Sequence, residues 1–458
     1  MRVKRDHQLS LCFRLASVVS ELKIVQEFQA RYKRISDLLD KNPEILEWVH
    51  EDLKRLSVGK KEDGKGERKS GYTSENIFRS LIVLCVEGLS FRDAVVRIAD
   101  SGILWEFARL GMREMMDFTF LNKCYNAIRP ETWEAIHRVL GRYAQGEGLI
   151  DPKVVRTDTT VVEANIHYPT DSALLWDSYR VSVRWIRRAK GLVKGVERHR
   201  FHDDKVKGHS LYITRYIGSG SKGRKREVRR RFRKLIASVR RVWGIGAEVC
   251  EAAKGSLNWE LAEIGLELGY YLPAVKTVAD VAERVAVRGE RVGAGERVFS
   301  IFEQHVELIK RGKRGKPVEF GHKVVLSQTR EKFISDYEVL PEQVEEGLVL
   351  EEELEDHKGL YGAYPEVSAG DGGLWAGEEA MERMGKKVGV LAVPKRVTDW
   401  GKEWMNPWQA FRAGIEGTIS VLKRAFGLMK CLFRGFKNFA SAVGMAVFCH
   451  NLICLTRT

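Results

Sequence analysis

The sequence predicts an α/β fold: a mixed sheet flanked by helices, an all-α N-terminal domain, and a helical insertion between the first strands and the rest of the core. Three observations predict it. Beyond residue 148, β-branched runs alternate with helical repeats, as in α/β domains. Before that residue, and again over about 172–290, the apolar positions follow helical spacing. The 458 residues, 44% of them hydrophobic, suffice for about three domains with real cores.

The N-terminal part divides into two helical segments. Residues 1–58 show helical spacing, as in VVSELKIVQEFQARYKRISDLL, and a charged, glycine-containing linker follows at about 59–71. Residues 72–147 then form a helical module in which Ser90 caps the run FRDAVVRI. The helices around 90–111 suit a helix-turn-helix DNA reader, although spacing alone does not establish a recognition helix.

Strand signals begin within residues 148–458. GLIDPKVVRTDTTVVEANI favours two short strands, and five later runs favour further strands: RVFSIFEQHVELI, KPVEFGHKVVLSQ, FISDYEVL, EVSAGD and KVGVLAV. An acidic helix over 342–356 and long helices from about 406 to 455 complete the pattern. The apolar stretch FASAVGMAVFCHNLICL contains Ser441, His450 and Asn451, which is typical of a buried helix rather than a membrane span.

Charge and cysteine usage narrow the class of protein. Lys and Arg total 77 against 62 Asp and Glu, and the net charge of +15 suits a polyanionic partner such as nucleic acid. The seven Cys are scattered, without a CxxC pair or His at zinc-finger spacing. We interpret them as reduced thiols and expect a cytoplasmic protein.

Three acidic residues stand where α/β folds place ligand groups. Asp158 follows the strand-forming run KVVRT, and Asp371 ends EVSAGD before two glycines that permit a sharp turn. Glu416 lies in FRAGIEGTISVLKRAFGL, where Arg412 and Lys423 fall within about 60° of it around one helix axis. Converging carboxylates would suit Mg²⁺, and two ions about 4 Å apart can cleave a phosphodiester. An ordinary surface ion pair or an Asp-Gly turn explains the same residues, because 62 acids offer many triples.

A basic run lies inside the insertion, in KGRKREVRRRFRKLIASVRR over 222–241, with Glu227 as its single acid. A solvated helix face is one interpretation. The density of charge and the interleaved Phe232 and Trp243 favour contact with a phosphate backbone instead. The residues expected to bind DNA here are Lys222, Arg224, Lys225, Arg226, Arg229, Arg230, Arg231, Arg233 and Lys234.

Several stretches together resemble the successive blocks of DDE transposases from bacterial insertion sequences: RTDTTVVEANIHYPTDSALL, GKPVEFGHKVVL, AGDGGL, FRAGIEGTISVLKRAFGLMKCLFRG and HNL. LSFRDAVVRI resembles that family's N-terminal transposase domain, so the resemblance spans most of residues 72–455. The C-terminal block is the most specific, because Arg412, Glu416 and Lys423 meet the family pattern of Arg, three residues, Glu, six residues and Lys.

The resemblance implies a ribonuclease H-like catalytic core in which Asp158, Asp371 and Glu416 are the catalytic metal ligands. Arg412 and Lys423 would then help to hold DNA. It implies two Mg²⁺ ions, with Mn²⁺ able to substitute, cleavage at the element's ends, and attack of the freed 3′ hydroxyl on target DNA. The partners would be the double-stranded inverted repeats, the target duplex and a second copy of the chain in a synaptic homodimer, with no membrane. Two departures concern strand handling: Gln409 and Leu374 stand where relatives carry Tyr.

Two other functions fit the same sequence features. One is a metal-dependent nuclease that cuts DNA without strand transfer. The other is a domesticated, non-catalytic DNA-binding protein, against which the intact acids Asp158, Asp371 and Glu416 count. In each case we expect a protein associated with the bacterial nucleoid.

Overall fold

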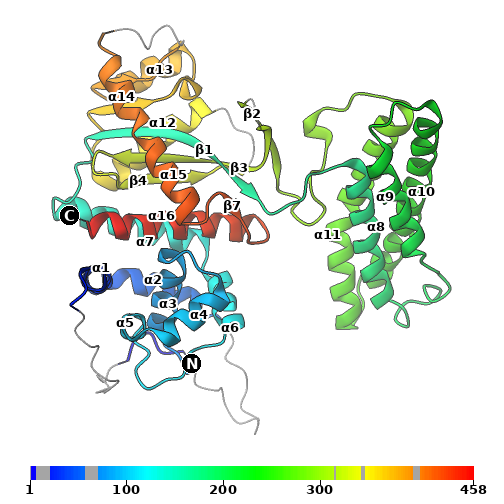
Figure 1. The fold of residues 1–458 in the computed structure, drawn as a ribbon, viewed down its shortest axis with the longest axis horizontal. Coiled ribbons are helices and arrows are strands. Elements are labelled where there is room, and N and C mark those ends of the chain that lie inside the picture. The colour runs from blue at the N-terminus through cyan, green and yellow to red at the C-terminus, as the bar shows by residue number, and fades with distance from the viewer. Residues whose placement is uncertain are drawn as a thin grey trace. The chain divides into compact units, whose positions relative to one another are not determined.

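The computed structural model describes six ranges of the chain: 2–6, 21–56, 71–313, 316–341, 346–395 and 403–457. The chain forms two compact units, shown in Figure 1, of which unit 1 comprises 1–165 with 321–458 and unit 2 comprises 166–320. The linker expected at 59–71 lies outside the described residues except for Gly71.

These units divide the chain differently from the sequence expectation. The N-terminal helices belong to the same unit as the sheet, and the inserted unit runs from 166 to 320, whereas helical spacing indicated about 172–290. The inserted unit is longer because it also contains strand β2 and the first residues of strand β3.

The N-terminal part of unit 1 is a layer of helices that shares one core with the C-terminal helix α16. Two of its starts are capped: Thr73 and Asn76 cap each other's backbone N–H groups at the start of α3, and, as the sequence predicts, the Ser90 hydroxyl accepts from Asp93 N at the start of α4. The helices are α1 (Lys23–Lys41), α2 (Pro43–Leu53), α3 (Ser74–Val86), α4 (Phe91–Asp100), α5 (Gly102–Phe107), α6 (Phe118–Ala127) and α7 (Pro130–Gly146).

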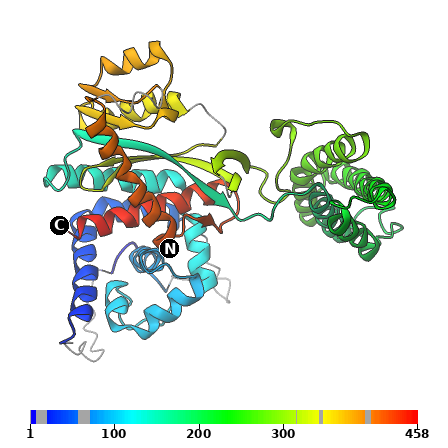
Figure 2. The same cartoon turned by 45° about the horizontal axis from the view of Figure 1, so that its top comes forward.

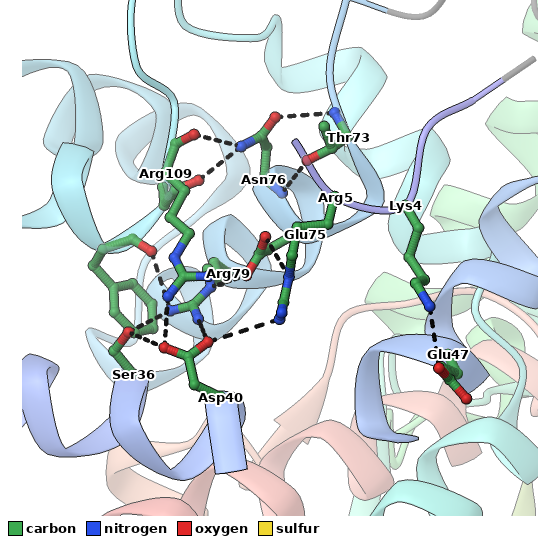
Figure 3. Close-up of polar contacts among 12 residues, drawn as sticks. Lys4, Arg5, Ser36, Asp40, Glu47, Thr73, Glu75, Asn76, Arg79 and Arg109 are labelled. Carbon is green, nitrogen blue, oxygen red and sulfur yellow. Dashed lines mark hydrogen bonds and ion pairs between the residues drawn. The ribbon is translucent and has the colours of Figure 1, made fainter. Parts of the chain in front are cut away.

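A network of ion pairs joins these helices, as Figure 3 shows. The fully buried Arg79 of α3 donates to Glu75 at 3.1 Å and to Asp40 of α1 at 2.9 Å. Arg109, beyond α5, donates to the same two carboxylates at 2.6 and 2.5 Å. A buried guanidinium is tolerated when its donors are satisfied. The network therefore fixes α1, α3 and the turn after α5 relative to one another.

The sheet is mixed, with seven strands in the described ranges. Its main order is β2-β3-β1-β5-β6, with β4 paired to β3 and β7 paired to β1. Strand β1 is antiparallel to β3, β3 is antiparallel to β4, and β1, β5 and β6 are parallel. The strands are β1 (Val154–Ala164), β2 (Glu307–Lys313), β3 (Lys316–Thr329), β4 (Ile334–Val339), β5 (Val367–Gly370), β6 (Val390–Ala392) and β7 (Lys430–Cys431).

Strand β1 is one continuous strand where the sequence favoured two short ones. It pairs with β3 without a break from Val155 opposite Thr329 to Glu163 opposite Gly321. A Cβ at Gly321 would lie 2.0 Å from the Val162 carbonyl oxygen, so the glycine permits this close approach. The pairing partner, which is distant in sequence, therefore decides the length of β1.

Helices cover both faces of the sheet. On one face the Thr157 hydroxyl contacts Ser327 Oγ at 2.7 Å, and Ser327 donates to Glu353 of α12 at 2.6 Å. Successive side chains alternate across a strand, so Asp158 faces the opposite side, where α14 and α15 cross the sheet (Figure 1). The elements are α12 (Glu346–Tyr361), the 3₁₀ turn η3 (Gly372–Leu374), α13 (Glu378–Gly385), α14 (Asn406–Ala413), α15 (Ile415–Ala425) and α16 (Phe436–Leu455).

Helix α16 is the apolar C-terminal segment noted in the sequence. Its length and composition would allow it to cross a membrane, and 78% of its most apolar stretch is buried inside the protein. Asn451 on this helix exchanges two hydrogen bonds with the backbone of Ile334 in β4. The helix thus packs against α7 and the sheet as part of the core of unit 1.

Unit 2 is a bundle whose long helices lie side by side, as Figure 2 shows. Leu175, Phe232 and Ile264, from three different helices, belong to its shared apolar core. The elements are α8 (Asp171–Arg188), α9 (Asp203–Tyr216), α10 (Lys222–Ala253), α11 (Trp259–Ala282), the π-helical turn η1 (Glu283–Arg288) and the 3₁₀ turn η2 (Ala294–Glu296). The protein is therefore α/β, with a mixed sheet flanked by helices, as the sequence predicts.

Candidate active site

Two neighbouring parallel strands bring Asp158 and Asp371 to the same edge of the sheet. The pairing of β1 with β5 ends at Thr157 opposite Gly370, so each aspartate is the next residue on its strand's path. Asp371 follows β5 as predicted, and its Oδ1 accepts from Gly373 N at 2.9 Å, which caps the turn η3. Asp158 lies inside β1 and not after it, because β1 continues along β3 beyond the end of β5.

The helical residues of the site come from two helices. The sequence placed Arg412, Glu416 and Lys423 on one face of a single helix, but α14 ends at Ala413 and α15 begins at Ile415. Arg412 is therefore on α14, whereas Glu416 and Lys423 are on α15. Periodicity did not indicate this break, because Gly414 between the helices keeps helical dihedral angles, with φ −63° and ψ −18°.

Arg412 connects two of the three carboxylates. Its Nη1 donates to Asp158 Oδ2 at 3.0 Å, and its Nη2 donates to Glu416 Oε1 at 3.5 Å. The Arg412 and Asp158 side chains are each 10% exposed, whereas that of Glu416 is 67% exposed. The site therefore has a buried floor and an accessible rim, and Arg412 is already paired with two of the acids.

The charges of the other two acids act on Asp158. Burial raises the pKa of Asp158 to about 6, and the neighbouring charges of Asp371 and Glu416 raise it too, against the lowering effects of Arg412 and of the hydrogen bond from Thr159 N. A single guanidinium does not offset burial and two like charges. The arrangement favours additional positive charge beside Asp158.

A buried polar network holds α14 and α15 against the sheet. Arg156, two residues before Asp158 on the same face, donates to Gln328 Oε1 at 2.6 and 2.9 Å and to the Phe411 carbonyl at 2.8 Å. Gln328 in turn donates to Thr418 Oγ1 of α15 at 2.7 Å. Since a Cβ at Gly414 would lie 2.1 Å from Arg156 Nη1, the glycine leaves the space that this arginine fills. Nothing in the sequence pattern singled out Arg156, although it lies in the motif RTD.

The two departures from the family pattern have structural roles. Gln409 Nε2 donates to the Gly370 carbonyl at 3.2 Å and to the Ala392 carbonyl at 3.1 Å, which joins the ends of β5 and β6 just before Asp371. Leu374 is fully buried and packs in the core between α12 and α13. Both residues therefore support the segment that carries Asp371.

The basic residues predicted to bind DNA in the insertion lie on α10 in unit 2, and they differ in their pairing. Arg230 and Arg231 each bond Glu227 at 2.7 Å. Arg229 and Arg233 are exposed, as are Lys222, Arg224, Lys225, Arg226 and Lys234. Phe232 was interpreted as part of this nucleic-acid surface, but it is only 2% exposed and belongs to the core of the bundle. A helix of this length has a buried face, and Phe232 lies on it.

Comparison with known proteins gives no identification. No protein-family model, no curated protein and no solved structure matches the chain. The assignment of chemistry to this site therefore depends on its own geometry and on the resemblance of its sequence motifs.

The residues fit a hard divalent cation in the chemistry of their donors. Mg²⁺ takes one or two carboxylates and completes its shell with water and phosphate oxygens, so Asp158 and Asp371 would hold an ion, and Glu416 would contribute from the rim. In the described part of the chain no three His, Cys, Asp or Glu side chains lie close enough together to hold a metal. Asp158 and Glu416 thus share Arg412 without forming a complete ligand set with Asp371, and Arg412 supplies positive charge beside Asp158.

Proposed function

We propose that the chain is a DNA transposase that cleaves phosphodiester bonds with divalent cations and joins the freed 3′ hydroxyl to target DNA. One observation carries the proposal. The motifs select Asp158, Asp371 and Glu416 from distant parts of the sequence, yet the first two follow the paired ends of β1 and β5, Arg412 bonds Asp158 and Glu416, and the charges of Asp371 and Glu416 act on Asp158. Spacing alone gave no reason for these three of the 62 acids to converge.

The order of the strands supports a ribonuclease H-like core. Along β4-β3-β1-β5-β6, the three strands nearest the β4 end alternate in direction and the last three run parallel. The first aspartate is on the central strand β1, the second follows its parallel neighbour, and the glutamate is on a later helix that crosses the same face. This is the arrangement that the family resemblance implies.

The chain's own residues would orient the carboxylates that hold the ions. Bound Mg²⁺ or Mn²⁺, as one or two ions, would supply activation of the attacking oxygen and stabilisation of the leaving oxygen. Arg412 orients the Asp158 carboxylate by its bond of 3.0 Å, and the Gly373 backbone orients that of Asp371. The exposed Glu416 can turn towards either the ion or Arg412.

Charge supports DNA as the substrate. The net charge of +15 favours a polyanion, and α10 supplies exposed cations, among them Arg229 and Arg233. Lys423 lies on the same helix as Glu416, partly exposed, and would contact the strand held near the site. A second copy of the chain would hold the other end of the element in a synaptic homodimer, and such a protein would work at the nucleoid in the cytoplasm.

The test is cleavage of a labelled duplex taken from either side of the coding sequence, with Mg²⁺ or Mn²⁺. Asp158→Asn, Asp371→Asn and Glu416→Gln should each lower cleavage and joining by about a thousandfold, because each removes a charged metal ligand. The matched control is Glu366→Gln, which removes an exposed acid just before β5 that pairs with Lys153. It should cleave like the wild type.

Two results would change the assignment. Cutting without joining would leave a nuclease with the same acids. Binding of the duplex without cutting, or equal cutting by all the variants, would exclude the proposed chemistry and leave a DNA-binding protein.

A further inference from the structure

A cavity of about 360 Å³ lies in unit 2 between α9, the segment before it, and α10. One wall is a face of α10 at helical spacing, with Lys234, Ser238 and Arg241. The other wall includes Arg200 and Lys205. The remaining lining residues are Tyr179, Phe201, His202, Val206, His209, Ala237 and Val242, so no carboxylate lines the cavity.

The four cations of this cavity are unpaired. Within the described bundle, no hydrogen bond or ion pair is recorded for the side chains of Arg200, Lys205, Lys234 and Arg241, and all four are exposed. Three nearby arginines on α10 have carboxylate partners instead: Arg230 and Arg231 share Glu227, and Arg240 pairs with Asp280 at 2.9 Å and with Glu283. The cavity is therefore lined by positive charge that no lining carboxylate offsets.

The pKa of His209, which lines the cavity, is lowered by burial and by cations of the cavity. Burial lowers its pKa, and Arg231, Lys234 and Lys205 lower it further. Its Nδ1 accepts from Arg231 Nη1 at 3.0 Å, which leaves the ring proton of the neutral imidazole on Nε2. The lining thus offers hydrogen-bond donors around a positive cavity, which is the chemistry that recognises a phosphate.

Two acids near the cavity are bonded to other side chains. Asp203 bonds Arg187 at 2.9 Å and accepts from the Tyr179 hydroxyl at 3.4 Å. Glu227 is held by Arg230 and Arg231. An incoming anion therefore meets cations without having to displace a carboxylate from them.

We propose that this cavity binds a phosphate group of the DNA backbone through Arg200, Lys205, Lys234 and Arg241. The inference deepens the proposed function, on which it rests: it identifies a defined phosphate site on the inserted unit. Backbone phosphate is the source that the surroundings favour, because the exposed cations at the start of α10 continue from the cavity along the same helix and can follow a strand.

The test compares two adjacent arginines of the full-length chain. Arg241→Gln removes a cavity cation, and Arg240→Gln removes its neighbour, which is paired outside the cavity. Binding of a labelled duplex of about three helical turns is measured over a range of salt concentrations. Arg241→Gln should weaken binding by about tenfold and reduce the slope of log affinity against log salt by about 0.9. Arg240→Gln should change affinity less than twofold.

Lys205→Gln and Lys234→Gln should act in the same direction as Arg241→Gln, and thermal unfolding of each variant checks that the bundle is intact. Equal losses for Arg240→Gln and Arg241→Gln would overturn the site in favour of a diffuse basic surface. Binding of inorganic phosphate or pyrophosphate that depends on Arg241, with duplex affinity unchanged, would overturn the DNA assignment in favour of a free phosphate ligand.

This result can be separated from the fate of the proposed function. Asp158→Asn should keep the wild-type affinity for the duplex while losing cleavage. A wild-type chain that binds no duplex would overturn both proposals, whereas a chain that binds and cuts DNA with no difference between Arg240→Gln and Arg241→Gln would overturn only the phosphate site.

Discussion

The two faces of the sheet each carry a cluster of acids that includes a carboxyl group with a raised pKa, in opposite surroundings. Asp158, Asp371 and Glu416 form the open acid cluster, which contains Arg412 and reaches solvent through Glu416. Asp336 and Glu353 form the buried acid cluster on the other face. Burial raises the pKa of Asp336 to about 7 and that of Glu353 well above its usual value. In the buried cluster Glu353 accepts from Ser327, and Asp336 Oδ1 accepts from Tyr337 N.

The difference teaches that a raised pKa alone does not identify a functional site. In the buried cluster the raised pKa values favour the protonated, neutral carboxyl groups. Arg138 forms its ion pair with the neighbouring Asp356 and not with Asp336 or Glu353. The open cluster contains a guanidinium and an exposed carboxylate, so an external cation or phosphate can take part. Access to solvent, together with a cation, separates the two.

The largest expected effect is on the pH dependence of stability in the buried acid cluster. The pKa of Asp336 is raised from 3.8 to about 7, so the folded state holds a proton that the unfolded chain releases. Its stabilising contribution is present below pH 4 and is lost as the pH rises through 7. At pH 8, Asp336→Asn should therefore be more stable than the wild type by on the order of 3 kcal/mol, and at pH 4 the two should be nearly equal. Urea unfolding at both pH values measures this, and a difference independent of pH would contradict it.

The second prediction concerns the cation. Arg412→Met leaves Asp158 buried without its partner, which should cost about 3 kcal/mol of unfolding free energy at pH 8. Protonation of Asp158 should relieve part of this cost at pH 5. The control Arg138→Met removes an exposed partner of Asp356 beside the buried cluster and should cost less than about 1 kcal/mol. Denaturant unfolding measures the loss of unfolding free energy in both variants. Equal losses for Arg412→Met and Arg138→Met would contradict the prediction.

The third prediction shifts the open cluster without changing its charge. Gly414→Ala places a methyl group against Arg156 Nη1 and should cost about 2 kcal/mol while it displaces α15. Gly417→Ala, one residue after Glu416 on α15, meets nothing within 4 Å and should be neutral or stabilising by up to about 1 kcal/mol. The unfolding free energy and the rate of DNA cleavage should both fall in Gly414→Ala and in neither case in Gly417→Ala. Similar losses of stability and cleavage in both variants would show that any change in α15 has this effect, and that the contact between Gly414 and Arg156 is not its cause.

The smallest expected effect is stabilisation by metal. Mg²⁺ at about a tenfold excess over its dissociation constant should raise the unfolding free energy by roughly 1.4 kcal/mol, because it binds the folded site. Asp336→Asn should keep this gain, and Asp158→Asn combined with Asp371→Asn should lose it. Thermal melts with Mg²⁺ and with EDTA measure it, and a gain retained by the double variant would place the ion elsewhere.

Local sequence patterns predicted much of the site but not its connections. The Asp-Gly-Gly after a β-branched run placed Asp371 at a strand end, because that turn chemistry is local. The same patterns wrongly placed Asp158 after its strand and wrongly predicted a single helix through residue 414. Strand length and the helix break depend on partners distant in the sequence, which local patterns do not contain. Asp336 and Glu353 gave no signal, since only their burial makes them unusual.

By itself, the sequence determined the α/β class, the capped helices, the basic character and the three acids that its motifs select, because periodicity, capping and charge are properties of short segments. The tertiary structure decided that Arg412 joins Asp158 to Glu416, that Arg156 and Gln328 hold the helices in place, and that Phe232 is core while Arg241 faces a cavity. These facts depend on contacts between residues far apart in the chain, and such contacts form only when the whole chain packs.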